Sequence, residues 1–284
     1  MLGGHSLCAH PESVLGMRSL TLHVWASKTC MVLRTLKALD CRKGSENEAW
    51  EAFVPSQAAD ASILGFVTQP AHAALAGRLA AVLNGQLFGK IPEEVVAIIG
   101  MHDTGWAEVD LAALEDAGSK PPSSFISIPS AIAVRAWQRS IAEATTKSAL
   151  SANVVRSHFC LLAPRDEDAE HLLFRNEEEA RLRQVSPDPK YDVKDIEHFI
   201  AFLGFCDLLS LQLCSGWPGD FKLPLAHPAH PRAKDAPKIS ISINEGIVHL
   251  SGTKFPLGTS VHVNAWQATL AGTLRNQRYE WKFR

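Results

Sequence analysis

Four side chains that can ligate a metal ion stand within apolar stretches of the sequence: His72, His102, Asp103 and Asp207. Asp207 is the only charged residue between His198 and Asp220, in the run Phe-Cys-Asp-Leu-Leu-Ser-Leu. A helix over this run would bury the carboxylate, and a buried charge without a partner is strongly destabilising. Asp207 therefore needs a cation, which is either a metal ion or a buried Arg or Lys, unless it faces a watery cleft.

His102 and Asp103 close a second predicted helix, which is apolar for the two turns before them. Adjacent helical residues point about 100° apart, so the two side chains can bracket one ion. His72 is in register with Leu75 and Leu79 on the apolar face of another predicted helix, where a lone His is more often a core residue. Because three helices offer ligand-type side chains, we favour a shared metal site. Two imidazoles and two carboxylates suit Mn, Fe, Co, Ni or Zn better than Ca.

The order His, His-Asp and a distant Asp resembles the HD superfamily of metal-dependent phosphohydrolases. Three runs more closely resemble a bacterial family catalogued as a domain of unknown function: TQPAH at 68–72, HDTGW at 102–106 and CDLLS at 206–210. This resemblance covers about residues 63 to 225. It implies an HD-like helical domain that binds one or two divalent metal ions, the first of them through His72, His102, Asp103 and Asp207. In that superfamily, extra histidines before the last Asp usually serve a second ion, and His158 is the candidate here.

Further candidate residues surround these ligands. His158 lies on the inward stripe of a predicted helix, and is a metal ligand, an acid beside the metal or a buried structural His. Glu108 and Asp110 are candidate general bases or acids at the mouth of a pocket, unless they lie in a solvated loop. Trp106 and Arg156 are candidate substrate-binding residues, since a guanidinium can bind phosphate; a surface charge is the alternative for Arg156.

Together these residues predict a metal-dependent hydrolase that acts on a phosphomonoester or phosphodiester. The ion would lower the pKa of a bound water, with Asp103, His158 and Glu108 as the catalytic candidates. The expected partner is therefore a small phosphorylated substrate. Two alternatives stay open: a di-iron oxygenase on the same HD scaffold, and a non-catalytic module in which the metal staples the helices or a ligand is sensed.

Helical periodicity is expected to position these residues. It predicts helices over about 69–84, 92–103, 130–144, 147–163, 175–185 and 193–215. Residues 217–237 contain five prolines, which indicates a connector in which His227 is expected to be flexible. Beyond residue 237 the period changes to two and predicts antiparallel strands.

The fold class that follows is mainly α, an HD-like helical bundle with a small C-terminal antiparallel β appendage. We expect four parts along the chain. They are a partly disordered N-terminal extension over 1–62, a helical metal-binding domain over 63–216, the Pro-rich connector over 217–237 and the β appendage over 238–284.

The composition predicts a globular, cytoplasmic protein. Of 284 residues, 46% are hydrophobic, and the net charge of -2 gives no indication of nucleic-acid or membrane binding. The most apolar segment, 199–214, is shorter than the roughly 18 residues that span a bilayer, and it carries Asp207. Six scattered cysteines without a CxxC pair are typical of a reducing compartment.

Overall fold

The computed structural model describes most of the chain beyond residue 63. The described residues are 31–35, 64–116, 125, 128–163, 168–184, 190–216, 219–268 and 273–284. The N-terminal extension predicted over 1–62 lies outside the described residues, except for 31–35, which form strand β1 (Met31–Thr35). The predicted domain boundaries stay predictions.

Seven α-helices occupy the described residues between 69 and 215. They are α1 (Gln69–Leu83), α2 (Glu93–Ile99), α3 (Ala107–Asp116), α4 (Ser130–Lys147), α5 (Ala149–Leu162), α6 (Ala169–Gln184) and α7 (Val193–Ser215). Local caps fix the ends of α1 and α7. The Thr68 hydroxyl accepts the N–H of Ala71 at 3.3 Å. Asp192 and Asp195 form a capping box at the start of α7, and Gly216 ends that helix in the left-handed conformation.

The helix predicted over 92–103 is shorter in the structure. It ends at Ile99, and a turn over residues 101–103 leads into a short 3₁₀ helix, η3 (Thr104–Trp106). The Nδ1–H of His102 donates to the Ile99 carbonyl at 2.8 Å, and so satisfies one of the carbonyls that a helix end leaves unpaired. A turn, and not a helix, therefore presents the His-Asp pair.

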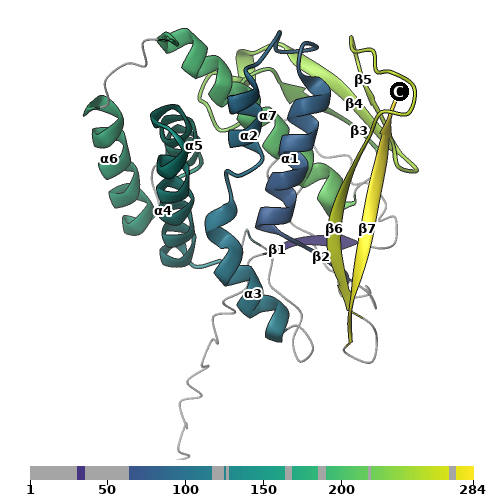
Figure 1. Cartoon of the computed structure of the whole chain (residues 1–284), viewed down its shortest axis with the longest axis horizontal. Helices are drawn as coiled ribbons and strands as arrows, with labels where there is room; N and C mark the ends of the chain where they lie inside the picture. The colour runs from purple at the N-terminus through teal and green to yellow at the C-terminus, as the bar shows by residue number, and fades with distance from the viewer. Residues whose placement is uncertain are drawn as a thin grey trace, which may run out of the picture.

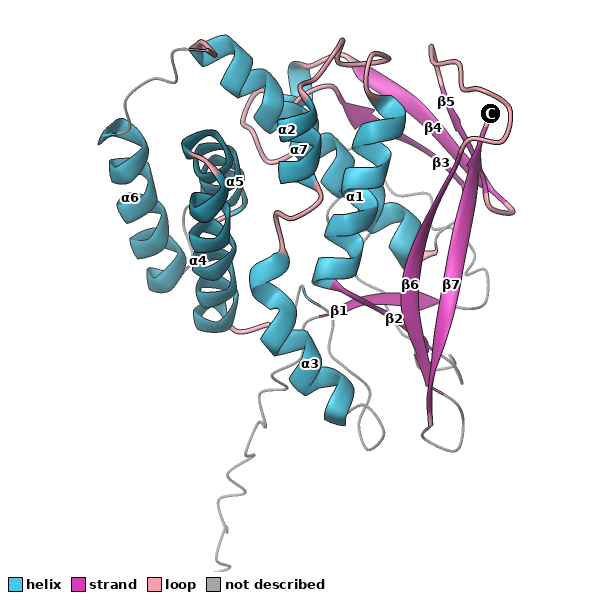
Figure 2. Cartoon of the chain, viewed as in Figure 1, coloured by secondary structure: helices cyan, strands magenta, loops and turns pink. Residues whose placement is uncertain are grey.

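A seven-stranded sheet lies beside the helices, in the order β1-β2-β6-β7-β5-β4-β3. Neighbouring strands are antiparallel except for β5 and β7, which are parallel. Figure 1 and Figure 2 show the sheet as a curved layer on one side of the molecule. The strands after β1 are β2 (Leu64–Thr68), β3 (Gly219–Pro224), β4 (Lys238–Asn244), β5 (Ile247–Leu250), β6 (Ser260–Ala268) and β7 (Leu274–Phe283).

The predicted fold class, a mainly α HD-like bundle with a small C-terminal β appendage, is wrong. Strand β2 pairs with β6, through Gly65 with Gln267 and Phe66 with Trp266, so strands from both ends of the chain share one sheet. An alternating pattern indicates that a segment is extended, but it does not identify the partner strand. The local patterns therefore predicted a small separate sheet where the structure has a large continuous one.

Helix α7 is the centre of the fold. It packs against α1 and α5 and also contacts β1 and β3, and every residue from Phe202 to Ser215 is buried. Figure 1 shows α1 and α7 between the sheet and the outer helices α4, α5 and α6. Among the described residues, α7 is the one helix long and apolar enough to cross a membrane, but 83% of its most apolar window is buried inside the protein. This burial is what a core helix of a soluble protein shows.

Candidate metal centre

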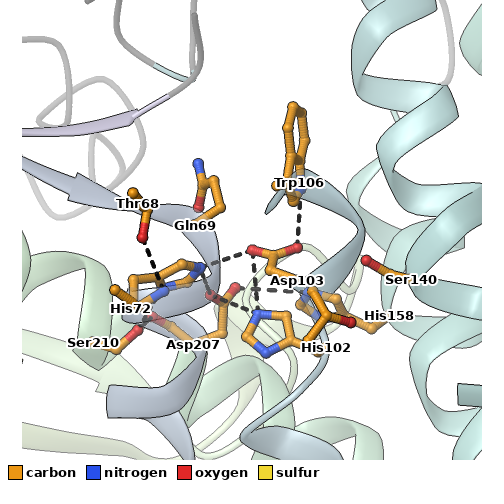
Figure 3. Close-up of polar contacts among 12 residues, drawn as sticks. Thr68, Gln69, His72, His102, Asp103, Trp106, Ser140, His158, Asp207 and Ser210 are labelled. Atoms are coloured by element: carbon orange, nitrogen blue, oxygen red, sulfur yellow. Dashed lines mark hydrogen bonds and ion pairs between the residues drawn. The ribbon is translucent and has the colours of Figure 1, made fainter. Parts of the chain in front are cut away.

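Three buried ligand-type side chains meet at the centre of the fold. His72 comes from the first turn of α1, His102 from the turn after α2, and Asp207 from the middle of α7. One ligand atom from each lies within 4.8 Å of the other two. The three residues are 1%, 0% and 5% exposed. Figure 3 shows these side chains and that of Asp103 pointing toward one another.

The separations between these atoms lie within about 0.3 Å of those expected for ligands of one ion. The Nε2 atoms of His72 and His102 lie 3.7 and 3.4 Å from Oδ1 of Asp207. They lie 2.8 and 3.5 Å from Oδ2 of Asp103. Ligands about 2.1 Å from an ion and about 90–110° apart are about 3.0–3.4 Å from each other. The structure thus contains a buried group that can bind a metal ion, and the identity of the ion stays a prediction.

The tautomer of His102 leaves a lone pair facing this group. Its Nδ1 carries a proton, because it donates to the backbone carbonyl of Ile99. A neutral imidazole protonated at Nδ1 has its lone pair on Nε2. That Nε2 is buried and has no hydrogen-bond partner among the described residues. A buried acceptor without a donor, close to two carboxylates, needs a cation.

His72 has the same tautomer for a different reason. The Ser210 hydroxyl donates to the Asp207 carbonyl at 2.7 Å, so its oxygen accepts the Nδ1–H of His72 at 2.8 Å. The Nε2 lone pair of His72 then faces Oδ2 of Asp103 at 2.8 Å. Two lone pairs at this distance repel each other unless a proton or a metal ion lies between them. The second imidazole therefore fits a metal ion as well as the first.

When no metal is bound, a proton on Nε2 of His102 supplies the positive charge that the two carboxylates need. Burial alone would lower the pKa of His102, but the carboxylates of Asp103 and Asp207 outweigh it and raise the pKa to about 9. Burial would likewise raise the pKa of Asp207, but the protonated imidazole of His102, with Nε2 3.4 Å from Oδ1, holds that pKa below its ordinary range. A divalent ion must therefore displace a proton from His102, as metals do when they bind imidazole ligands.

Asp103 is also held from its other side. Its Oδ1 accepts the indole N–H of Trp106 at 3.1 Å. The N–H of Gly105 donates to the Ser140 hydroxyl at 3.0 Å, which anchors the same turn to α4. Trp106 is thus in contact with a predicted metal ligand, and its predicted role in substrate binding stays a prediction.

His158 lies beside the three-residue group, as the sequence predicted for an inward-facing residue. It is 1% exposed, its ring is edge-on to that of His102, and its Nε2 is 3.7 Å from Oδ2 of Asp207. Its Nδ1 is 2.8 Å from Nε2 of His227, which the sequence placed in a flexible connector. His227 is 3% exposed. The many prolines around His227 suggested mobility, and no local pattern showed that it is buried.

Arg156 and Glu108, two further predicted site residues, make their polar contacts away from the three-residue group. The Nε–H of Arg156 donates to Oε2 of buried Glu178, on α6, at 2.6 Å. Glu108 is at the start of α3, with its side chain 75% exposed and paired with Arg139 at 2.6 Å. The substrate-binding role of Arg156 and the catalytic role of Glu108 stay predictions, and these contacts do not bring either residue to the ligands.

Asp110 is a buried acid near the start of α1. It is 2% exposed and accepts the N–H of Gln69 on Oδ2 at 2.5 Å, whereas its Oδ1 has no hydrogen-bond partner among the described residues. Burial, opposed by the Gln69 hydrogen bond and assisted by the charge of Asp103, raises the pKa of Asp110 to about 8. The sequence suggested a solvated loop for this residue, but α3 turns it inward.

Asp110→Asn is expected to stabilise the protein increasingly as the pH rises from about 4 to 8. The folded state holds the Asp110 proton up to about pH 8, whereas the unfolded chain loses it near 3.8, so ionisation favours unfolding across this window. The amide removes that ionisation and keeps an acceptor for Gln69. Each pKa unit corresponds to about 1.4 kcal/mol, so one unit raises the Tm by about 3–6 °C.

Thermal unfolding at pH 5 and pH 8 tests this expectation. Glu115→Gln is the matched control, since Glu115 is an exposed acid on the same helix. An Asp110→Asn variant whose advantage over the wild type is the same at both pH values would contradict a buried, proton-holding carboxyl.

The fold and the site define a class of protein: mixed α and β, with a continuous seven-stranded sheet and a buried His–His–Asp group of the metal-binding type. A family model described as "Protein of unknown function (DUF3891)" matches residues 57–266, and the chain belongs to this family. No curated protein and no solved structure matches the chain. The predicted membership of an uncharacterised family is therefore confirmed, whereas the relation to the HD superfamily stays a prediction.

Proposed function

We propose that this protein is a metal-dependent hydrolase that acts on a phosphate ester. The proposal rests on one observation, the convergence of two imidazole lone pairs and a carboxylate at a buried point. There, no donor among the described residues satisfies Nε2 of His102. The order of His72, His102-Asp103 and Asp207 along the chain resembles that of HD phosphohydrolases and supports a phosphorylated substrate.

The residues of the chain hold and orient the site. A divalent ion bound there supplies a Lewis acid, which activates water near neutral pH and polarises a phosphoryl oxygen. His72 and His102 keep Nε2 turned inward, because Ser210 and a backbone carbonyl occupy their Nδ1–H groups. Asp103 presents Oδ2 to the group while Trp106 holds Oδ1. With His72, His102 and Asp207 as the ligands, Oδ2 of Asp103 would be left to accept a proton from the attacking water.

The count of ligand groups supports a single-ion site over a di-iron oxygenase. The described residues contain one group of three or more ligand-type side chains with atoms within 4.8 Å of one another. One group supports a single ion, whereas a di-iron oxygenase needs ligands for two. Iron in the purified protein, a visible absorption band and oxygen consumption are the observations that would instead support the oxygenase.

Asp103→Asn is expected to lower phosphoesterase turnover by at least about 100-fold, because an amide cannot accept the proton of the attacking water. The fold should be retained, since the amide oxygen still accepts the Trp106 N–H. Hydrolysis of p-nitrophenyl phosphate and bis(p-nitrophenyl) phosphate by the Mn²⁺- or Zn²⁺-loaded protein measures the turnover, and thermal unfolding checks the fold.

Glu115→Gln serves as the control in these assays too, since that exposed side chain should leave turnover unchanged. Wild-type turnover by Asp103→Asn would reject the mechanism. A protein that binds the metal and loses thermal stability without it, yet hydrolyses neither ester, would instead support a metal that only staples the helices.

A further inference from the structure

A second pair of buried histidines lies beside the metal centre, and the mechanism above does not use it. His158 comes from α5, and His227 from the segment between β3 and β4. Nδ1 of His158 and Nε2 of His227 are 2.8 Å apart, so one proton lies between them. The other nitrogen of His158, Nε2, is 3.7 Å from Oδ2 of Asp207. The pair therefore links the connector to a proposed metal ligand.

A backbone group decides which nitrogen carries each proton. The N–H of Ala229 donates to Nδ1 of His227 at 3.2 Å, so that nitrogen holds the lone pair and the proton of His227 is on Nε2. His227 consequently donates to Nδ1 of His158. The proton of His158 must then be on its Nε2, the atom nearest Asp207, which leaves no lone pair there for a metal.

His158 thus has the opposite tautomer to His72 and His102. Those two imidazoles present lone pairs to the site, whereas His158 presents an N–H. The two oxygens of Asp207 are divided in the same way. Oδ1 faces the Nε2 atoms of His72 and His102, and Oδ2 faces the N–H of His158.

The connector packs closely against α7 at His227 and Pro228, beside the histidine pair. A Cβ at Gly204 would lie 2.5 Å from Cδ2 of His227 and 2.8 Å from Cδ of Pro228, so only a glycine allows this approach. The N–H of His230 also donates to the His227 carbonyl at 2.9 Å. Gly204 is three residues before Asp207, so the ring of His227 packs against the turn of α7 that leads to the proposed ligand.

We propose that His227 is a positioning residue of the metal centre. It fixes the tautomer of His158, whose Nε2–H in turn faces Oδ2 of Asp207 at 3.7 Å and leaves Oδ1 to bind the ion. This inference rests on the metal centre proposed above. Burial also lowers the pKa of His227 to about 4, so the His227 imidazole is neutral near pH 7, as the arrangement requires.

The tautomers can be measured in the wild-type protein by NMR of ¹⁵N-labelled histidine with Zn²⁺ bound. We expect His158 and His227 to be protonated at Nε2. His72 and His102 should be protonated at Nδ1, with Nε2 shifted by the metal. Coordination of Zn²⁺ by Nε2 of His158 would overturn the inference and leave the metal centre in place.

His227→Phe is expected to weaken Zn²⁺ binding about 10-fold, a usual cost of removing a partner behind a metal ligand. Phenylalanine keeps the ring volume but cannot donate to His158. His227→Gln, whose amide can donate, should restore the affinity to within about 2-fold of the wild type. Gly204→Ala should resemble His227→Phe, because the added methyl displaces an intact His227 ring.

His230→Phe is the matched control, since His230 lies in the same connector and accepts the N–H of Arg232. It should leave Zn²⁺ affinity unchanged. Equal affinities for the wild type, His227→Phe and His230→Phe would overturn the inference while the proposed function stands. A wild-type protein that binds none of Mn²⁺, Fe²⁺, Co²⁺, Ni²⁺ and Zn²⁺ would overturn both. The wild-type NMR measurement decides the matter if His227→Phe does not fold.

Discussion

Replacing His102 with alanine is expected to reduce the affinity for Zn²⁺ or Mn²⁺ by at least about 100-fold. Losing a partner behind a ligand already costs about 10–100-fold, and this change removes a ligand itself. The orphaned Nε2 lone pair disappears, and so does the hydrogen bond from Nδ1 to the Ile99 carbonyl. Elemental analysis of the purified protein and calorimetric titration with Zn²⁺ measure the loss, and the analysis of the wild type also identifies the ion.

His198→Ala is the control for this experiment. His198 is on α7 with Asp207, but its Nε2–H donates to the Phe88 carbonyl at 2.6 Å. The control variant should therefore bind metal as the wild type does. Full metal occupancy in His102→Ala would show that His72, His102 and Asp207 do not form the site.

Gly105→Ala is expected to destabilise the protein by about 3 kcal/mol, which lowers the Tm by about 6–12 °C. A Cβ at this position would lie 2.2 Å from the Ala136 carbonyl oxygen and 2.5 Å from the Ser140 nitrogen. Both atoms belong to the backbone of α4, so neither can move aside as a flexible side chain would. The turn that carries His102 and Asp103 must then separate from α4, and metal affinity should fall as well.

Gly100→Ala provides the comparison, because Gly100 lies at the start of the same turn. There, the nearest atom to an added Cβ is the Ala97 carbonyl oxygen at 3.4 Å, and the backbone of Gly100 is helical. We expect a stability change below about 1 kcal/mol for this variant. Thermal unfolding and Zn²⁺ titration of both variants test the difference. Equal stability of the two would show that the turn does not depend on close packing against α4.

Local sequence patterns were sufficient to predict the three buried side chains that meet at the centre of the fold and most of the helices. Helix α7 has the predicted bounds. The residues that cap it, the capping box at its start and the glycine at its end, are each next in sequence to the turn that they cap. Asp207 is the one carboxylate in the apolar run of that helix after His198, which predicted a buried, cation-binding site there. His72 and His102 followed because each stands on an otherwise apolar segment.

Contacts between distant segments could not be predicted in this way. The pairing of Phe66 with Trp266 depends on two strands at opposite ends of the chain, and neither strand carries a signal for the other. The burial of His227 could not be predicted for the same reason, because it depends on Gly204 in a different element. The end of α2 at Ile99 is accompanied by a hydrogen bond from His102, a residue that the sequence placed at the end of the helix as a metal ligand.

The direct junction between β2 and α1 has a consequence for shortened versions of the chain. Thr68 is both the last residue of β2 and the cap of α1, and His72 follows one turn later. The family match runs from residue 57 to residue 266, which is Trp266 on the strand that pairs with β2. The first turn of α1 therefore follows directly on a strand that is paired with the other end of the chain. A truncation that deletes β6 would remove the strand that pairs with β2, four residues before His72.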